Sequence, residues 1–456
     1  MQKYWNCYVA MEHFNYFRLK FTHQMTFRRI PLIFFIAFTF IALNSSPIKH
    51  LGIKGENASA IAIYIEDLRS GKAVTDINSE MTLTPASIIK SLTSATALCM
   101  LGPEFRFSTK VTRNGNHITI IPSGDPTLES QHFPEYAGFI DSIIKYFPIN
   151  GQNIAIDTKH QTSTQGPLPI WDIEDVAWDY GVGWFYFNWR DNTYTLYPNT
   201  GETSPTIPGL KYNLEISDTS STNLLRGIGS DSLSIIVNRK KLFQKNFHIK
   251  SSMWNPSEVF LSEISKRHNS IDTVHNPKMI YMHSSPCLKD ILKSMMHRSD
   301  NMMAEGVLRA LSINCRLDSS LIKQQQFWID RLPYAEFNTI RDGSGLARSN
   351  RISPKFLAGI LKYMAKSDLA TDYTDIFPIC GHDGTVRTFL KNTWLEGHVA
   401  LKSGSMSGVQ CYAGYKLDNN RVPTHSIVVM VNGIYCPRTD LRKAIERFLL
   451  NVFTRN

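Results

Sequence analysis

The sequence predicts an α+β fold, in which strands from both ends of the chain form one antiparallel sheet with helices packed on it. Residues 59–78 read as two strands joined by a Ser-Gly turn, and a helix follows them. At the other end, residues 398–418 and 425–434 read as strands, and residues 438–453 read as a helix. Because strand, strand and helix occur in the same order at both ends, the most economical arrangement is a single sheet that uses both.

The middle of the chain predicts a large β-rich insert in this fold. From about residue 105 to residue 282, short runs such as "HITIIP" and "LSIIVN" alternate with Gly, Pro, Asn and Asp. Helical texture returns at residues 284–311. We therefore predict an N-terminal extension at 1–47, a main domain formed by 48–104 and 283–456, and an inserted region at 105–282.

Composition restricts the possible partners and cofactors. The formal net charge of the 456 residues is +10, and residues 1–29 contribute +4 of it, because they hold five basic residues and one acidic residue. The rest has no dense Lys/Arg run and no basic stripe interleaved with aromatic residues, so we expect no nucleic-acid partner. The seven cysteines are widely spaced, without a C-x-x-C pair or a matching histidine pattern, so we expect no metal site.

The N-terminal segment predicts export. Arg28 and Arg29 precede an apolar run from Ile30 to Leu43, which is short for a membrane span and suits a secretory signal. Small and polar residues follow, and Met25 is a plausible initiator, so we place the signal segment around residues 25–46. The expected location is the periplasm or the outer face of the cytoplasmic membrane. The alternative is an N-terminal anchor that is not cleaved.

Ser87 and Lys90 are the first candidates for chemistry. Thr84 can cap the helix that contains them and Pro85 suits its first position, and residues three apart lie on one face of a helix. A serine hydroxyl becomes a good nucleophile when a nearby base takes its proton. Lys90 can be that base if desolvation or a neighbouring positive charge, for which Lys402 is the candidate, lowers its pKa.

Two further motifs make this interpretation specific. Ser299-Asp300-Asn301 and Lys402-Ser403-Gly404 follow in order, and the set S-x-x-K, S-x-N and K-[ST]-G is the signature of penicillin-binding proteins and serine β-lactamases. The candidate catalytic residues are therefore Ser87, Lys90, Ser299, Asn301 and Lys402.

Longer segments resemble one family within this group. They are "SGDPTL" from Ser123, "HSSPCLKDILKSMMHRSDNMMAE" from His283, "RDGSGLARSNRISP" from Arg341 and "GHDGTVRTFL" from Gly381, and all are similar to D-alanyl-D-alanine carboxypeptidases of the penicillin-binding protein 4 type. The first two motifs lie 212 residues apart (299 − 87), and such a long gap is typical of this family, which carries extra domains there. The resemblance implies a β-lactamase/transpeptidase-like domain with an insert between the first two motifs.

The resemblance also implies the activity. It is that of an exported serine D,D-carboxypeptidase, with D,D-endopeptidase action, which cleaves D-Ala-D-Ala and D-alanyl cross-links of peptidoglycan stem peptides through an acyl-enzyme on Ser87. No cofactor is expected, β-lactam antibiotics are expected to be covalent inhibitors, and the oligomeric state is open. The alternatives are a β-lactamase or esterase on the same scaffold, or an inactive wall-binding homologue.

Substrate contacts are expected from the third motif and from the insert. Ser403 suits a substrate carboxylate, Gly404 lets substrate lie along the strand, and the Ser405 N–H, together with the Ser87 N–H, would form an oxyanion hole. In the family, an aspartate near a tryptophan-rich segment binds the amino group of a diamino acid. The best match in "WDIEDVAWDYG" is Asp175, and Asp172 is the alternative. The candidate substrate-binding residues are thus Ser403, Gly404, Ser405 and Asp175.

Overall fold

The computed structural model describes residues 50–149, 153–160, 165–171, 176–218, 221–226, 232–244, 246–268 and 278–454. The predicted signal segment and the predicted ligand Asp175, like its alternative Asp172, lie outside the described residues. The predicted domain boundaries stay a prediction.

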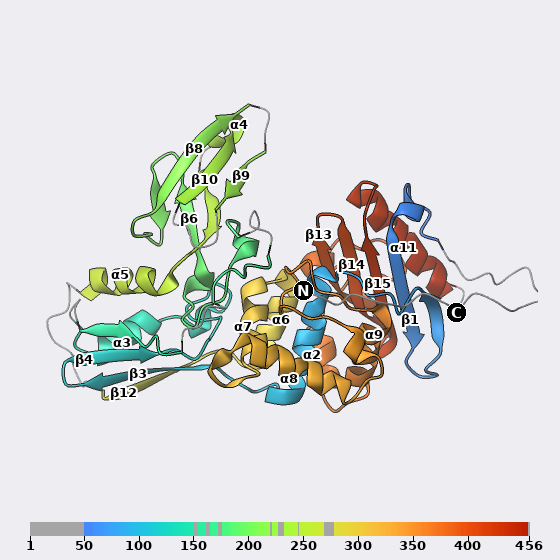
Figure 1. The fold of residues 1–456 in the computed structure, drawn as a ribbon, viewed down its shortest axis with the longest axis horizontal. Helices are drawn as coiled ribbons and strands as arrows, with labels where there is room; N and C mark the ends of the chain where they lie inside the picture. Colours follow the sequence, from blue (N-terminus) through green and yellow to red (C-terminus); the bar gives the residue numbers. More distant parts are fainter. Residues whose placement is uncertain are drawn as a thin grey trace, which may run out of the picture. The chain divides into compact units, whose positions relative to one another are not determined.

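Five strands form one antiparallel sheet in the order β13-β14-β15-β1-β2. The pairing of β1 with β15 runs from Ala60 opposite Asn432 to Asp67 opposite His425, so the sheet joins the two ends of the described chain (Figure 1). This sheet, with its helices, confirms the predicted α+β fold. The strands are β1 (Ala60–Asp67), β2 (Ala73–Ile77), β13 (Val399–Met406), β14 (Val409–Leu417) and β15 (Pro423–Asn432).

One strand prediction was too coarse. Residues 398–418 form a hairpin of two strands, β13 and β14, and not one strand, because the chain reverses at Ser407 and Gly408. Gly408 has a φ of +73°, which glycine adopts without strain. Apolar residues continue on both sides of this turn, so the hydrophobic pattern alone does not reveal it.

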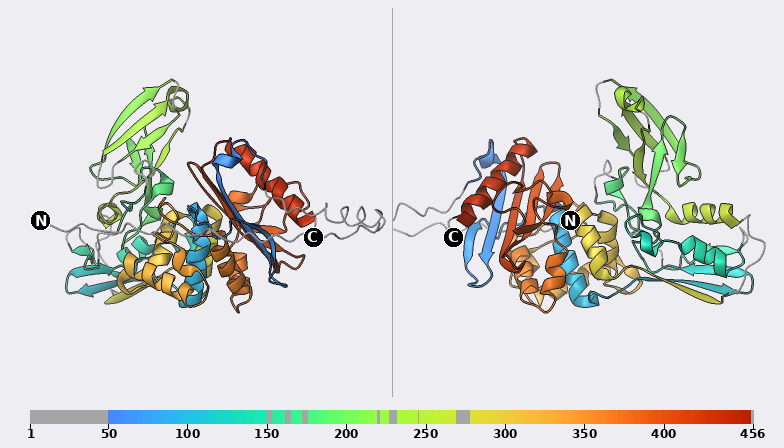
Figure 2. Two further views of the ribbon diagram at one scale, coloured as in Figure 1. Left: turned by 45° about the vertical axis from the view of Figure 1, so that its right-hand side comes forward. Right: turned by 180° about the vertical axis from the view of Figure 1, so that it is seen from behind.

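Helices cover both faces of the sheet. Along β1, Ala62 and Tyr64 face a core shared with helices such as α2 and α9, whereas Ile61, Ile63 and Ile65 face a second core shared with α11. This alternation is the period of a strand buried on both sides. Figure 2 shows α11 against one face and the other helices on the opposite side. The helices are α2 (Ile89–Leu101), α6 (Leu288–Arg298), α7 (Asn301–Arg309), α8 (Leu317–Ile329), α9 (Pro354–Ala365), α10 (Ala370–Asp375) and α11 (Arg438–Thr454).

Three small sheets build the β-rich region. The first has the order β12-β3-β4-β5, the second β11-β6-β7 and the third β8-β10-β9. Their strands are β3 (Ser108–Asn114), β4 (His117–Ile121), β5 (Ile154–Ile156), β6 (Thr193–Tyr197), β7 (Glu202–Ser204), β8 (Lys211–Ser217), β9 (Asn223–Leu225), β10 (Ser232–Asn238), β11 (Ile249–Ser252) and β12 (Ile280–Ser284). The helices beside them are α3 (Phe139–Tyr146), α4 (Arg239–Leu242) and α5 (Pro256–His268).

The tryptophans of the β-rich region do not all belong to its own core. The sequence predicts that an aromatic cluster forms the core of the insert, with contact to glycan as the alternative; its members are Trp171, Trp178, Trp184, Phe185, Tyr186 and Trp189. Trp189 lies in that core, but Trp171 joins the core of the helices on the large sheet, and Trp184 packs with Met302 of α7. The expectation is therefore wrong for these two tryptophans, because a buried tryptophan can bury its ring against any element that the fold brings near.

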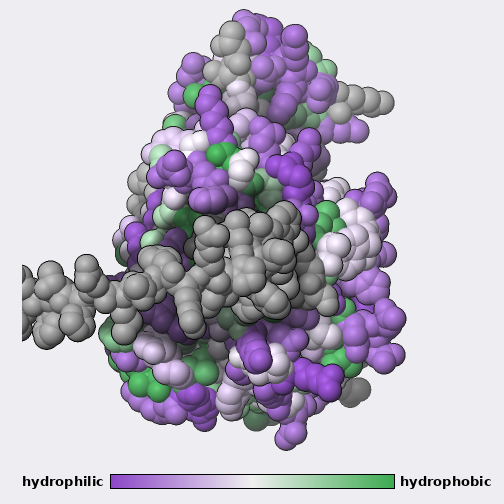
Figure 3. Space-filling view, turned by 90° about the vertical axis from the view of Figure 1, so that its right-hand side faces the viewer, coloured by the Kyte–Doolittle hydropathy of each residue, from purple (hydrophilic) through white to green (hydrophobic). Residues whose placement is uncertain are grey.

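None of the helices among the described residues is long and apolar enough to cross a membrane. On the face drawn in Figure 3, hydrophilic side chains predominate, with hydrophobic ones scattered between them, outside the area that grey atoms cover. The six cysteines of the described residues are all free thiols, and four of them are buried.

Candidate active site

The candidate nucleophile lies in a tight turn before a helix. Ser87 is the middle residue of the 3₁₀ turn η2 (Ala86–Ile88), which leads directly into α2, and the preceding Ala86 has a φ of +47°. This left-handed conformation is rare for alanine and is typical of functional turns. The expected cap by Thr84 is wrong, since no side chain caps this turn and the Thr84 hydroxyl donates to Arg348 O.

Lys90 is buried, and its ammonium group contacts three oxygen atoms. Nζ lies 3.0 Å from Ser87 Oγ, 2.7 Å from Asn301 Oδ1 and 2.6 Å from Ser344 O. Burial lowers the pKa of Lys90 to about 8, so of the two causes that the sequence suggests, desolvation is the main one. Three carboxylates oppose this shift by attraction; they are Asp342, Asp300 and Glu305.

The second motif occupies the junction of two helices. Ser299 ends α6 in a left-handed conformation, with a φ of +61°, and Asp300 begins α7 by accepting a hydrogen bond from the Met303 N–H at 2.8 Å. Asn301 is the first residue of α7. After this sharp reversal of the chain, Ser299 and Asn301 line the same cavity as Ser87.

The third motif lies on β13 and contacts the second. Lys402 Nζ donates to Ser299 Oγ at 2.9 Å and to Ser403 O at 2.7 Å. Burial, followed by repulsion from Lys90, holds the pKa of Lys402 well below its ordinary value. The structure therefore brings all five candidate catalytic residues together, because Ser87, Ser299 and Asn301 line one cavity, Lys90 contacts Ser87 and Asn301, and Lys402 contacts Ser299. Their catalytic roles remain a proposal.

Gly404 is required by the close approach of β13 to the Ser87 turn. A Cβ atom at Gly404 would lie 2.8 Å from Pro85 O and 2.9 Å from the Ser87 nitrogen. The strand thus runs against the backbone of the candidate nucleophile, with Ser405 as the next residue. This contact suits the expected oxyanion hole, since it brings the backbone of β13 beside the Ser87 nitrogen and leaves no room for a side chain at position 404.

Two hollows in the surface adjoin Ser87 and Ser299. A cavity of about 780 Å³ is lined by Ser87, Ser299 and Asn301 of the first two motifs and by Ser405, which follows the third motif. Tyr180, Arg348, Met406 and Arg438 also line it. A smaller one, of about 370 Å³, is also lined by Ser87 and Ser299, together with Thr385 and Ser403, whose Oγ1 and Oγ atoms are 2.7 Å apart. Arg438 and Arg442 also line it, which makes it positively charged.

Several contacts of this site were not predicted, although the resemblance implies that the D-G-S-G turn with Asp342, Ser344 and Gly345 borders the active site. The Ser344 carbonyl contacts Lys90, and the Tyr180 carbonyl accepts a hydrogen bond from Asn301 Nδ2. Every residue has a backbone carbonyl, so the sequence does not indicate which carbonyl will accept a hydrogen bond from a side chain of the site. Thr385 lies within the "GHDGTVRTFL" segment that carried the family resemblance, and this was the available signal for it.

The described residues form no group of three or more His, Cys, Asp or Glu side chains that could hold a metal ion. The polar groups gathered around Ser87 are hydroxyls, ammonium groups, an amide and backbone carbonyls. This set can move a proton between serine and lysine.

Comparisons with known proteins identify a family and solved structures of similar fold. The D-Ala-D-Ala carboxypeptidase 3 (S13) family matches residues 49–177 and 262–452. The chain is 24% identical over 477 residues to the D-alanyl-D-alanine carboxypeptidase DacB of Haemophilus influenzae, covering 92% of this chain and 94% of that protein. The crystal structure of penicillin binding protein 4 from Haemophilus influenzae superposes with a TM-score of 0.69 at 21% identity, covering 87% of this chain and 96% of that one. A second structure of that protein, in complex with a β-lactam, gives a TM-score of 0.63.

Proposed function

We propose, from the premise that this chain belongs to the D-Ala-D-Ala carboxypeptidase 3 (S13) family, that it is a serine D,D-carboxypeptidase acting on peptidoglycan stem peptides. The observation that supports this most directly is the contact of Lys90 Nζ with Ser87 Oγ, at 3.0 Å, in a buried environment that lowers the pKa of the lysine to about 8. A lysine with this pKa is uncharged often enough near neutral pH to accept a proton from serine.

The reaction begins with acylation of Ser87. Its Oγ attacks the carbonyl carbon of the penultimate D-alanine while its proton passes to Lys90 Nζ. The N–H groups of Ser87 and Ser405 stabilise the oxygen that becomes negative, an effect worth about 3–4 kcal/mol for each donor. The bond to the terminal D-alanine nitrogen then breaks, and this nitrogen takes a proton from Lys90 by way of the Ser299 hydroxyl.

Deacylation needs one water molecule. The water oxygen attacks the acyl carbon and gives one proton to Lys90. The bond from the acyl carbon to Ser87 Oγ then breaks, Oγ takes this proton back from Lys90, and the peptide leaves one residue shorter with a free carboxyl group. Water is the one co-reactant that balances this cycle.

The smaller hollow is suited to the carboxylate of the terminal D-alanine. Ser403 and Thr385 offer hydroxyl donors, and Arg438 and Arg442 supply positive charge. A free carboxylate is present in a carboxypeptidase substrate and also next to the D-alanyl bond of a cross-link, so this hollow is compatible with both activities.

Asp175 is proposed to bind the amino group of the diamino acid in the stem peptide. Asp175→Asn should weaken turnover of meso-diaminopimelate peptides more than that of simple acyl-D-Ala-D-Ala substrates. Equal effects on both substrates would reject this role.

Export is proposed from the sequence of residues 25–46. Protein made from its own start should be found outside the cytoplasm and should begin between Asn44 and Ile48. A mature N-terminus that still contains Ile30 to Leu43 would favour an anchor.

The activity is tested by measuring release of D-alanine from a diacetyl-L-Lys-D-Ala-D-Ala peptide and by labelling with a fluorescent penicillin. We expect repeated turnover of the peptide, and a penicillin label on the wild-type chain that Ser87→Ala lacks. Some β-lactamases use a glutamate to activate the water that hydrolyses the penicilloyl-enzyme. The closest match to this pattern here is Glu258, which lies in the first turn of α5 and contacts Asn255. Without such a glutamate at Ser87, the bound penicilloyl group should be hydrolysed slowly. Rapid hydrolysis of penicillin without D-alanine release would indicate a β-lactamase, and absence of both label and release would indicate an inactive homologue.

A further inference from the structure

The loop of residues 342–345, called here the 342–345 loop, fixes the position of the candidate base. Its Ser344 carbonyl accepts a hydrogen bond from Lys90 Nζ at 2.6 Å, and its Gly343 carbonyl accepts one from Thr93 Oγ1 at 3.0 Å. A Cβ atom at Gly345 would lie 2.1 Å from Ala86 O, so the loop also lies directly against the Ser87 turn. A shift of this loop would therefore displace both the base and the nucleophile.

Two buried carboxylates hold the 342–345 loop. Asp342 accepts hydrogen bonds from the N–H groups of Gly345 at 2.9 Å and of Ala347 at 2.7 Å. Glu305 of α7 accepts from the N–H groups of Gly343 and Ser344, both at 2.9 Å. Four backbone donors close together in the chain are thus bound by two side chains from different places in the sequence.

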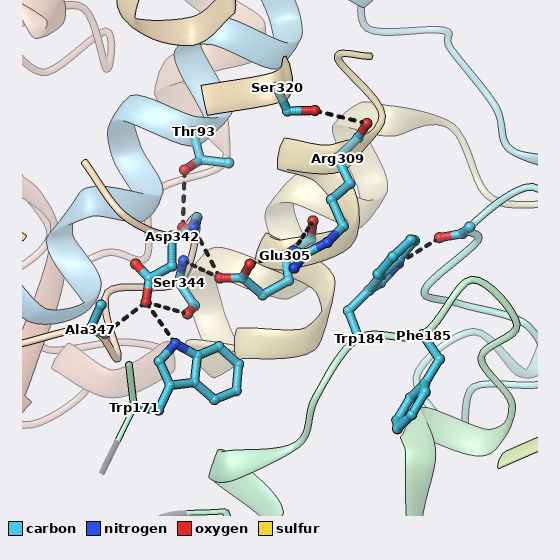
Figure 4. A network of polar contacts seen from close by, with 12 residues as sticks. Thr93, Trp171, Trp184, Phe185, Glu305, Arg309, Ser320, Asp342, Ser344 and Ala347 are labelled. Atoms are coloured by element: carbon cyan, nitrogen blue, oxygen red, sulfur yellow. Dashed lines mark hydrogen bonds and ion pairs between the residues drawn. The ribbon is translucent and has the colours of Figure 1, made fainter. Parts of the chain in front are cut away.

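One tryptophan of the β-rich region contacts Asp342, and a second one contacts the partner of Glu305. Trp171 Nε1 donates to Asp342 Oδ2 at 3.0 Å. On the other side, Glu305 pairs with Arg309 at 2.5 Å, and the Arg309 guanidinium lies 4.8 Å from the centre of the Trp184 ring. Figure 4 shows Trp171 below Asp342 and Trp184 beside Arg309, with Glu305 and Ser344 between them.

The same region makes a third contact with the active site. Tyr180 O accepts from Asn301 Nδ2, which leaves the other side of that amide, Oδ1, directed at Lys90. Two of the three oxygen atoms around Lys90 Nζ, Asn301 Oδ1 and Ser344 O, are therefore held in place through contacts with the β-rich region. The third, Ser87 Oγ, belongs to the turn that leads into α2.

We propose that Trp171 is a positioning residue for acylation, which acts through Asp342 and the 342–345 loop on the alignment of Lys90 with Ser87. The β-rich region is then a component of the catalytic machinery and not only a substrate-binding attachment. This inference rests on the proposed function, because it needs a reaction in which Lys90 activates Ser87.

The alternative is that Trp171 only stabilises the fold. Trp171 is 5% exposed and contributes to a large core, so a change that removes its ring would lower stability in either case. The distinguishing feature is the indole N–H, whose acceptor is the carboxylate that binds the loop. The test must therefore remove this one donor and keep the ring.

Trp171→Phe provides this change, and Trp189→Phe is a matched control. Trp189 is also buried in the β-rich region, and its Nε1 also donates to a carboxylate, Glu129, at 2.9 Å. That carboxylate binds the Ile140 N–H at 3.1 Å, far in the sequence from the 342–345 loop. For each variant and for the wild type, stopped-flow measurement with penicillin separates the dissociation constant of the first complex from the acylation rate constant. Thermal unfolding is measured in parallel.

We expect Trp171→Phe to acylate about tenfold or more slowly than the wild type, with an initial dissociation constant within about twofold, because misalignment affects the reacting atoms and not penicillin binding. Trp189→Phe should acylate at the wild-type rate at a similar melting temperature. The proposal is overturned if Trp171→Phe acylates as fast as the wild type, or if both variants are slowed alike.

A further variant covers the case in which Trp171→Phe does not fold. A benzothienylalanine at position 171, introduced by nonsense suppression, keeps the bicyclic shape and lacks the N–H donor. It should reproduce the slow acylation, and a wild-type rate would overturn the proposal. If the wild-type chain itself were not acylated by penicillin, the proposed function would fail instead, so the two failures are distinguishable.

Discussion

Lys402 Nζ and Ser299 Oγ lie 2.9 Å apart, although 103 positions separate them in the sequence (402 − 299). Each buried lysine of the site therefore has its own serine, since Lys90 Nζ contacts Ser87 Oγ at 3.0 Å. Ser299 lines the same two hollows as Ser87, so its hydroxyl can pass to a leaving nitrogen the proton that Lys90 takes from Ser87, while Lys402 holds it in place. This arrangement favours proton delivery, and not attack, as the role of Ser299.

Removal of the Ser299 hydroxyl should therefore slow acylation and leave binding nearly unchanged. We expect Ser299→Ala to reduce the acylation rate constant by about 10²–10⁴, the usual contribution of a positioned proton donor. Ser299→Gly serves as control, because glycine suits the left-handed φ of +61° better than alanine does. Equal losses in both variants would show that the hydroxyl matters, whereas recovery in the glycine variant would show that strain was the cause.

The rate of acylation should depend on pH through Lys90. Its pKa is lowered to about 8, so below pH 8 it carries a proton and cannot accept one from Ser87. The acylation rate constant at saturating penicillin should rise about tenfold per pH unit from pH 6 to 7 and level off above pH 8. Stopped-flow measurement from pH 6 to 9 tests this, and a rate constant that does not change over this range would contradict the role of Lys90 as base.

Local patterns were sufficient to predict the sheet and the three motifs. The alternation of Ile61, Ile63 and Ile65 with smaller or polar residues identifies a strand, and matching strands at the other end of the chain predict a shared sheet. Ser87 and Lys90 are neighbours in sequence, so their contact follows from helix geometry alone. The positions of Ser299 and Lys402 came from motif order and not from geometry.

Contacts between distant side chains could not be predicted in the same way. Nothing near Trp171 in the sequence indicates that its indole reaches Asp342, 171 positions later. The same applies to Glu305, which looks like an ordinary helix residue until α7 is placed beside the 342–345 loop. The hairpin turn at Ser407 and Gly408 was missed because the apolar pattern continues through both of its strands.

The close approach of β13 to the Ser87 turn predicts that Gly404→Ala will be inactive. The added Cβ would lie 2.8–2.9 Å from backbone atoms that cannot move without displacing Ser87. Acylation should fall by at least about 10², since a misplacement of about 1 Å can have this effect. Gly359→Ala on α9 is the control, because its Cβ would meet only the Leu332 side chain at 3.4 Å. Penicillin labelling of Gly404→Ala at the wild-type rate would show that the strand can retreat freely.

Asp300 provides a test that links stability, pH and the base. Burial raises its pKa to about 6, above the ordinary value of 3.8, even though its carboxylate accepts from the Met303 N–H. The folded chain therefore binds a proton here more tightly than the unfolded chain does. Stability that this proton provides is present below about pH 4 and is lost as the pH rises toward 6.

Asp300→Asn should remove this loss, because asparagine caps a helix as well as aspartate does and carries no charge to bury. The quantity to compare is the free energy of unfolding of the variant minus that of the wild type. This difference should grow as the pH rises from 4.5 to 7.5, by at most about 3 kcal/mol, since two pKa units correspond to that amount. The charge of Asp300 also raises the pKa of Lys90, so acylation by the variant should reach its plateau below pH 8. Urea unfolding at the two pH values and the pH profile of acylation measure both effects. A variant that is less stable than the wild type at pH 7.5, with an unchanged pH profile, would show that the carboxylate acts mainly as the cap of α7.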